Sequence, residues 1–135
     1  MAVVTILCSC QQEDKYHHRS IRFTNNLNVL LYVDYDFDYP DTVLKNHGEA
    51  MVYSNGDMHK VSPKTQATSP LWNPEFYEVI FRGNRIPSDT ITVFVFDSKK
   101  IESNPVEDNE AIIQYYYLSL PDLKRLDWKI SYPPS

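Results

Sequence analysis

The sequence contains an acidic segment whose side chains could bind a metal ion. Asp34, Asp36, Asp38 and Asp41 follow one another at short spacing. Oxygen ligands of this kind suit a hard cation such as Ca²⁺, which takes about six to eight of them. The same pattern is also typical of solvated loop carboxylates that bind nothing. The spacing alone leaves both interpretations open.

Two cysteines and two adjacent histidines form a second group of reactive side chains. Cys8 and Cys10 lie two residues apart, and His17 and His18 follow them. This spacing matches none of the familiar zinc patterns. Two cysteines on one face of an extended chain are also too close for a comfortable disulfide. We therefore expect reduced thiols, as in cytoplasmic proteins, and no zinc site.

No catalytic motif accompanies these residues. The chain has only three glycines, so it contains no glycine-rich phosphate loop. It also lacks the Gly-x-Ser-x-Gly and His-Glu-x-x-His patterns of hydrolases and metalloproteases. We expect a protein that is not an enzyme and that carries no cofactor, with calcium as the one candidate ion.

Length and charge limit the classes of function. The 135 residues are expected to form one domain, residues 1–135, and the composition, 42% hydrophobic and 23% charged, is ordinary for a globular protein. A net charge of −5 makes nucleic acid a poor partner, and it weakens the case for permanent adhesion to anionic membranes. No apolar run approaches the roughly 20 residues of a membrane-spanning helix.

The pattern of apolar residues predicts a protein made mostly of strands. Residues 89–97 are the clearest case, because Ile91, Val93 and Val95 lie at a spacing of two and Thr or Phe fills the alternate positions. A strand that is apolar on both faces belongs in the middle of a sheet that is covered on each side. Further strands are predicted at residues 2–10, 21–24, 27–35, 49–53, 58–67, 76–81 and 127–132, and around Tyr115 to Tyr117.

Turn residues separate these strands. Asn55-Gly56 predicts a tight hairpin turn, and Pro63 interrupts the strand at 58–67. The one helical signal is the spacing of three between Leu120, Leu123 and Leu126, which predicts a single turn. Eight or nine short strands separated in this way are typical of a two-sheet antiparallel sandwich.

Three segments carry a resemblance to a known family. They are Asn73-Pro74-Glu75 with the aromatic run after it, residues 89–97 with their terminal aspartate, and the Leu-Ser-Leu-Pro-Asp-Leu run of residues 118–123. In this order they resemble strand five, strand six and the segment after strand seven of C2 domains, which bind lipids or proteins. The N-terminal half matches weakly. The resemblance implies an all-β fold, an antiparallel eight-stranded β-sandwich of two sheets.

The resemblance also implies where calcium would bind. Asp97 matches the first aspartate of one ligand loop, Glu49 matches the residue that opens the third strand, and Asp38 or Asp41 would supply the other loop. Lys99 stands where a further acidic ligand is usual, and an ammonium there would repel the ion. We therefore expect a degenerate calcium site rather than a working one.

Two alternatives remain for the surface that binds a partner. Tyr115, Tyr116 and Tyr117 place aromatic rings on both faces of one strand, and tyrosine is enriched at protein interfaces. The other alternative is an anionic phospholipid surface, bound through the end loops with or without calcium, for which a few lysines supply roughly 1 kcal/mol each. The lipid-binding candidates are Val43, Leu44, Lys45, Lys60, Lys64, Lys99, Lys100 and Ile101.

The preferred hypothesis is a calcium-independent, protein-binding scaffold or adaptor in the cytoplasm. The runner-up is a module that lies peripherally on membranes.

Overall fold

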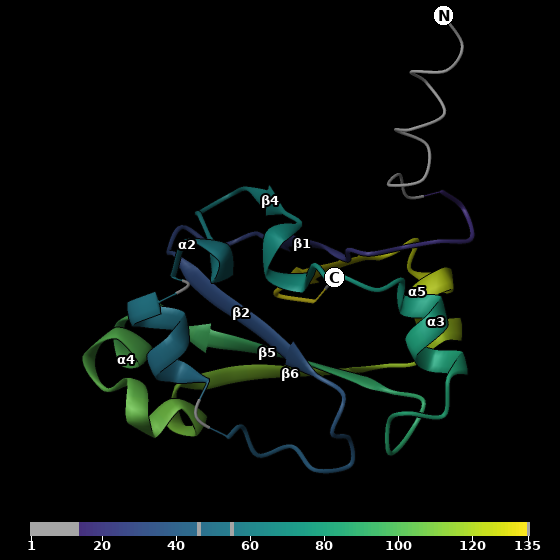
Figure 1. The fold of residues 1–135 in the computed structure, drawn as a ribbon. Coiled ribbons are helices and arrows are strands. Elements are labelled where there is room, and N and C mark those ends of the chain that lie inside the picture. Colours follow the sequence, from purple (N-terminus) through teal and green to yellow (C-terminus); the bar gives the residue numbers. More distant parts are fainter. Residues whose placement is uncertain (1–13, 46, 55, 135) are drawn as a thin grey trace, which may run out of the picture.

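The computed structural model describes residues 14–45, 47–54 and 56–134. This part of the chain contains seven strands in two sheets (Figure 1). The strands are β1 (Arg22–Asn25), β2 (Leu31–Asp36), β3 (Lys60–Val61), β4 (Gln66–Ala67), β5 (Ile91–Asp97), β6 (Ile112–Leu118) and β7 (Lys129–Tyr132). The predicted strand at residues 2–10 lies outside the described residues, and the prediction of eight strands is not met within them.

The larger sheet has four antiparallel strands in the order β3-β2-β5-β6. The β2–β5 ladder runs from the pair Leu31 and Asp97 to the pair Asp36 and Thr92. The first six residues of β5 are buried, as the apolar pattern on both faces predicts. On its other side β5 pairs with β6, with a register irregularity between Val95 and Phe96.

The smaller sheet has three strands in the order β4-β1-β7. β1 and β4 are antiparallel, whereas β1 and β7 are parallel, with Phe23 opposite Ile130. The expectation of purely antiparallel sheets is therefore wrong for this pair. Because β7 follows β1 by about a hundred residues of chain, no hairpin signal could reveal the pairing.

Short helices connect the strands. They are η1 (Ala50–Ser54, a π-helix), α2 (Gly56–His59), η2 (Ser69–Leu71, 3₁₀), α3 (Tyr77–Arg82), α4 (Ser98–Ser103), η3 (Pro105–Ala111, 3₁₀) and α5 (Leu120–Arg125). The predicted helical turn at Leu120 is confirmed as α5, and Ser119 and Asp122 form a capping box at its start. Among the described residues, none of the helices has the length and apolar character that a membrane span requires.

The predicted strand at residues 76–81 is wrong, since helix α3 occupies Tyr77–Arg82. Tyr77, Ile80 and Phe81 are buried while Val79 is exposed, so the buried residues follow the spacing of three and four that a helix requires. A run this short fits both a strand and a helix. Contacts made by the N-terminal segment favour the helix.

Those contacts come from His18. Its backbone N–H donates to Oε1 of Glu78 at 2.8 Å, and its ring Nδ1 lies 2.6 Å from Oε2 of the same buried carboxylate. The ring also stacks on Trp128 at 3.9 Å between centroids. The His18 carbonyl accepts from the N–H of Tyr77, in the first turn of α3.

The predicted strand at 49–53 is also wrong, because the π-helix η1 occupies Ala50–Ser54. Just before η1, a carboxylate oxygen of Asp108 accepts from the backbone N–H of both His47 and Gly48, which turns the chain toward the helix. Asn55 of the predicted hairpin turn lies outside the described residues, and helix α2 begins at Gly56. The strand predicted at 58–67 is shorter than expected and is divided into β3 and β4.

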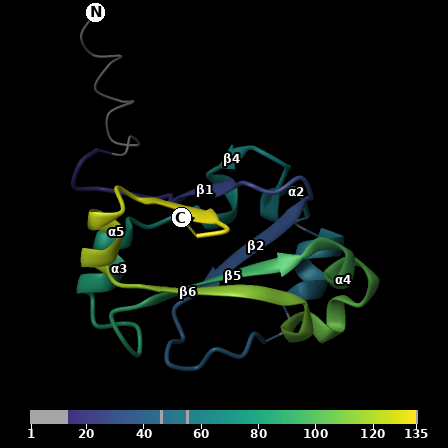
Figure 2. The ribbon, with the colours of Figure 1, turned by 180° about the vertical axis from the view of Figure 1, so that it is seen from behind.

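Two apolar clusters hold these elements together. The first joins the two sheets, with Phe23 and Ile130 from the smaller sheet and Val33 and Val95 from the larger, and it includes buried residues of α3 and α5. The second lies on the other face of β2 and β5, where Phe94 and other residues pack under η1, α4 and η3. The views in Figures 1 and 2 show α3 and α5 at one end of the larger sheet and α4 at the other.

Candidate functional site

The carboxylates predicted to hold calcium have separate local roles. Asp41 accepts from the N–H of Val43 at 3.0 Å and pairs with Lys45 at 3.3 Å. Asp97 caps α4 by accepting from the N–H of Lys100 at 3.0 Å.

The other two predicted calcium ligands are Asp38 and Glu49. Asp38 lies in the loop after β2, where its N–H donates to Asp36 at 3.2 Å, and Glu49 is exposed just before η1. Among the described residues, no group of three His, Cys, Asp or Glu side chains is placed to hold a metal ion. Cys8 and Cys10 lie outside the described residues.

A cluster that the sequence analysis missed surrounds Asp34. This carboxylate is nearly buried, and its Oδ2 lies 2.7 Å from Nδ1 of His47 while its Oδ1 lies 4.0 Å from Nδ1 of His59. The hydrogen bond to Asp34 raises the pKa of His47, although burial works against it. The three residues are far apart in sequence, so no motif could have revealed the cluster.

The predicted lipid-binding residues do not form one apolar tip. Leu44 and Ile101 are buried in the second core cluster, so neither side chain can enter a membrane without unpacking. Val43 is 57% exposed. Lys99 and Lys100 are exposed on α4.

Lys60 and Lys64, two further lipid-binding candidates, have partners within the fold. Nζ of Lys64 donates to the carbonyl of Asn26 at 2.7 Å. Lys60 lies 3.6 Å from the Asp57 carboxylate and 5.9 Å from the centre of the Tyr32 ring.

The three predicted interface tyrosines lie on β6. Tyr115 and Tyr117 stack on one face of the strand, with ring centroids 6.0 Å apart, and Tyr117 is 45% exposed. Tyr39 packs against Tyr117 at 5.3 Å. Tyr116 faces the smaller sheet, where its hydroxyl donates to the carbonyl of Ser131. Burial and the neighbouring Tyr132 raise the pKa of Tyr116 to about 12, so it is a neutral donor at physiological pH.

β6 is an edge strand. No other strand of the described residues pairs with its outer side. The seven residues Ile112–Leu118 contain no charge, no proline and no glycine. Charges and prolines are devices that proteins commonly use to keep an exposed edge from pairing with other chains. β6 has neither, so this edge can accept an added strand.

The ladder pattern identifies which backbone groups face outward. The Val33 carbonyl accepts from the His59 ring at 3.0 Å on the β3 side, so it points away from β5. Because bonded and non-bonded pairs alternate in an antiparallel ladder, Val95 must then bond to β6, where it pairs with Gln114. The next residue, Tyr115, and also Tyr117 therefore direct their N–H and C=O groups to the free edge.

One of these outward groups has a local partner. The Gln114 side-chain amide donates to the Tyr115 carbonyl at 2.9 Å. This bond agrees with the outward direction of that carbonyl. It is also the kind of exchangeable contact that an incoming strand can replace.

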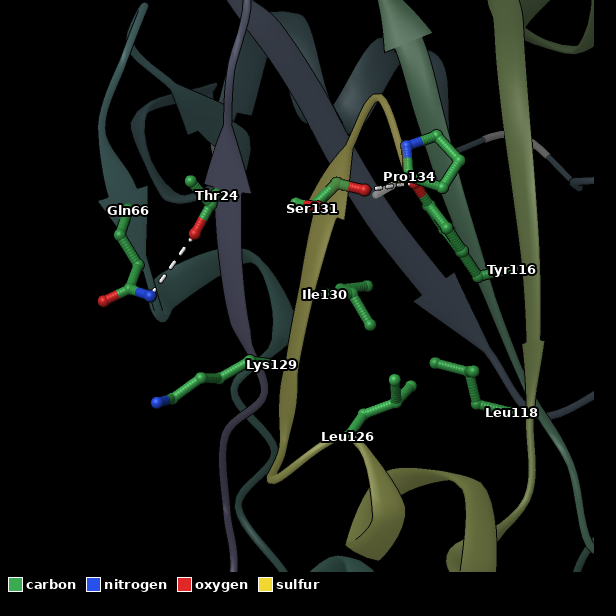
Figure 3. Close-up of a pocket in the computed structure, with 9 residues that line it drawn as sticks. All are labelled: Thr24, Gln66, Tyr116, Leu118, Leu126, Lys129, Ile130, Ser131 and Pro134. Carbon is green, nitrogen blue, oxygen red and sulfur yellow. Dashed lines mark hydrogen bonds between the residues drawn. The ribbon is translucent and has the colours of Figure 1, made fainter.

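An apolar cleft of about 370 Å³ lies between β6 and β7, the edge strands of the two sheets (Figure 3). Leu118 and Tyr116 line it from β6, Ile130 lines it from β7, and Leu126, 38% exposed, lines it from the end of α5. The other lining residues are Thr24, Gln66, Lys129, Ser131 and Pro134.

Sequence reasoning found the tyrosines of this site but missed the cleft. The absence of charge along β6 was the available signal for a free edge. The cleft also needs the position of β7, which the sequence pattern does not determine.

The edge of β6 and the adjacent cleft offer backbone hydrogen-bonding groups and apolar surface. Of the residues that line the cleft, Lys129 alone is charged, and its ammonium lies 3.6 Å from Asp127. The arrangement suits recognition of an extended polypeptide segment rather than acid–base or nucleophilic chemistry.

Comparison of the chain with protein-family models, with curated proteins and with solved structures finds no match.

Proposed function

We propose that this chain is a non-catalytic, calcium-independent interaction module that binds a partner protein along the free edge of β6. The observation that carries the proposal is the uncharged edge strand, whose outward backbone groups at Tyr115 and Tyr117 lie beside an apolar cleft. An exposed edge is a template for another strand, and pockets beside it select alternate side chains of the added segment.

The cleft suggests the chemistry of the segment that binds. Leu118, Leu126 and Ile130 present aliphatic carbon, so the side chains that enter should be small or medium-sized and apolar. Because alternate residues of a strand point to the same face, these side chains recur at a spacing of two. The opposite face of the segment would meet the rings of Tyr115 and Tyr117.

We also propose that the two sheets form a C2-like β-sandwich. The shared core between Phe23 and Ile130 on one side and Val33, Val93 and Val95 on the other supports this arrangement. The parallel β1–β7 pair and the helices η1 and α3 are departures from the expected pattern.

Selection from a displayed library of random peptides tests the binding function even though the partner is unidentified. Peptides enriched on the wild-type protein are then measured against two variants of one residue. Tyr117→Pro removes an outward N–H while leaving the ladder to β5 intact. Tyr117→Thr, the matched control, removes the ring but keeps the N–H and a good strand former.

We expect the enriched peptides to have apolar residues at alternate positions. Their affinity should fall at least about tenfold for Tyr117→Pro, because a backbone hydrogen bond and the fit of the strand are lost together, and only about threefold or less for Tyr117→Thr. Circular dichroism of both variants controls for folding. Failure to enrich any peptide, or equal binding by wild type and the proline variant, would refute the proposal.

A further inference from the structure

We infer that β6 pairs with β6 of a second copy of this chain, in antiparallel register about a two-fold axis at Tyr116. The inference rests on the proposed function, because it assigns a partner to the same edge. In this register the outward groups of Tyr115 face those of Tyr117 in the other copy, so each pair exchanges two backbone hydrogen bonds. The four-stranded sheet would then continue into an eight-stranded one across the axis.

The side chains of the strand are complementary to themselves in this register. Tyr115 and Tyr117 lie on one face and are already stacked. A two-fold axis at Tyr116 places Tyr115 of each copy opposite Tyr117 of the other, which brings four rings together. Cross-strand aromatic pairs of this kind favour strand association.

The neutrality of β6 removes the usual obstacle to self-pairing. The protein has a net charge of −5, so two copies repel one another at a distance. No charged residue lies between Ile112 and Leu118, and no pair of like charges is therefore brought together at the contact. A charge and a proline are two common devices that keep an edge strand from pairing with a second copy, and neither is present on β6.

The elements that flank β6 carry opposite charges. η3 precedes the strand and exposes Glu107 and Glu110, whereas α5 follows it and exposes Lys124 and Arg125. Antiparallel pairing places η3 of one copy beside the α5 end of the other, so acidic and basic groups meet at both ends of the contact. Parallel pairing would bring acidic groups against acidic groups.

One contact has to be exchanged when the dimer forms. The Gln114 side-chain amide donates to the Tyr115 carbonyl. It must rotate away so that the backbone N–H of Tyr117 from the other copy can donate to that carbonyl. The amide is partly exposed and can bond to water after it rotates.

Light scattering of the full chain during size-exclusion chromatography measures the oligomeric state over a range of concentrations. The wild type should reach the mass of a dimer as concentration rises, and Tyr117→Thr should also do so, at a somewhat higher concentration because it lacks the aromatic pairs. Tyr117→Pro should raise the dimer dissociation constant at least about tenfold, since the symmetry removes two hydrogen bonds per dimer.

A disulfide test checks the register independently of the proline variant. In a background with Cys8→Ser and Cys10→Ser, Tyr116→Cys should form a covalent dimer on mild oxidation, because residue 116 faces itself across the axis at a Cα separation of about 4.5 Å. Gln114→Cys is the matched control and should not form one, because residue 114 faces residue 118 of the other copy.

The outcomes separate this inference from the proposed function. A wild type that stays monomeric at high concentration, or a dimer that survives Tyr117→Pro and does not crosslink through residue 116, overturns the inference. If such a monomer still binds selected peptides in a manner sensitive to Tyr117→Pro, the proposed function stands while the second copy is excluded. Peptide binding that is unchanged by Tyr117→Pro would refute both the dimer inference and the proposed function.

Discussion

The contact between His47 and Asp34 shows how one residue can make stability depend on pH. The hydrogen bond raises the pKa of His47 in the folded state. The charged imidazole therefore contributes stability that is fully present below the unfolded value of about 6.5 and is lost as pH rises through the folded value. Burial also raises the pKa of Asp36 above its ordinary value of 3.8.

We expect the wild type to lose more stability than His47→Asn between about pH 6 and pH 9. The asparagine keeps a hydrogen-bonding group near Asp34 but does not titrate. Urea denaturation at both pH values measures the difference in the free energy of unfolding. Asp34→Asn, which removes the partner carboxylate, should reduce the pH dependence in the same way. Identical pH dependence in the wild type and both variants would contradict the assignment.

At the scale of the element, helix α4 and the loop after β2 pack into the second core cluster through Ile101 and Leu44. Ile101 belongs to α4 and is fully buried in the second core cluster. Its truncation leaves a cavity among Phe94, Phe96 and Leu44, in addition to the lost transfer free energy.

Ile101→Ala should therefore lower the free energy of unfolding by about 2–5 kcal/mol. Val43→Ala, the matched control on an exposed residue of the same predicted surface, should change it by less than about 0.5 kcal/mol. Chemical denaturation of the two variants gives both values. Similar small effects at the two positions would mean that Ile101 is not part of the core. Ile101 would then again be a candidate for contact with a membrane.

Elements with a long, regular pattern could be predicted from the sequence. β5 has apolar residues on both faces over six positions, and β7 and α5 also lie where the pattern placed them. The prediction for the segment around Tyr77 was wrong because its apolar run fits both the strand spacing of two and the helix spacing of three and four. The deciding contact is His18 with Glu78, which joins residues sixty positions apart.

The candidate site was predictable only in part for a similar reason. The tyrosines of β6 and the lack of charge around them are visible in the sequence. The cleft depends on the turn that returns the chain from α5 to β7, where Asp127 and Trp128 adopt left-handed φ values of 54° and 59°. Aspartate adopts such a conformation more often than most residues, but tryptophan does so rarely, and two in succession have no signal in the sequence. The position of Ile130 beside Leu118 could therefore not be predicted.

At the scale of the whole molecule, the larger sheet is covered on both faces but open at the β6 edge. The smaller sheet with α3 and α5 packs on one face, and η1, α4 and η3 pack on the other. This arrangement uses most of the large apolar side chains in the core. Among the described residues, the exposed edge of β6 and the cleft beside it form one region where the surface can gain contacts by binding another chain.

Calcium should leave the thermal stability of the whole molecule unchanged. A ligand that binds only the folded state, at a hundred times its dissociation constant, adds about 2.7 kcal/mol, which for a protein of this size raises the melting temperature by several degrees. Two of the predicted calcium ligands, Asp41 and Asp97, instead accept hydrogen bonds from backbone N–H groups, and Asp41 also pairs with Lys45. Melting curves in millimolar calcium, in magnesium and in a chelator should therefore coincide.

The isosteric variant Asp97→Asn sharpens the calcium measurement. Asparagine caps a helix about as well as aspartate, so the variant should melt close to the wild type in the absence of metal. If calcium stabilised the wild type in a saturable way and Asp97→Asn removed the shift while magnesium gave none, the carboxylates would form a working site. The module would then respond to calcium, and its binding along β6 would have to be measured again with the ion present.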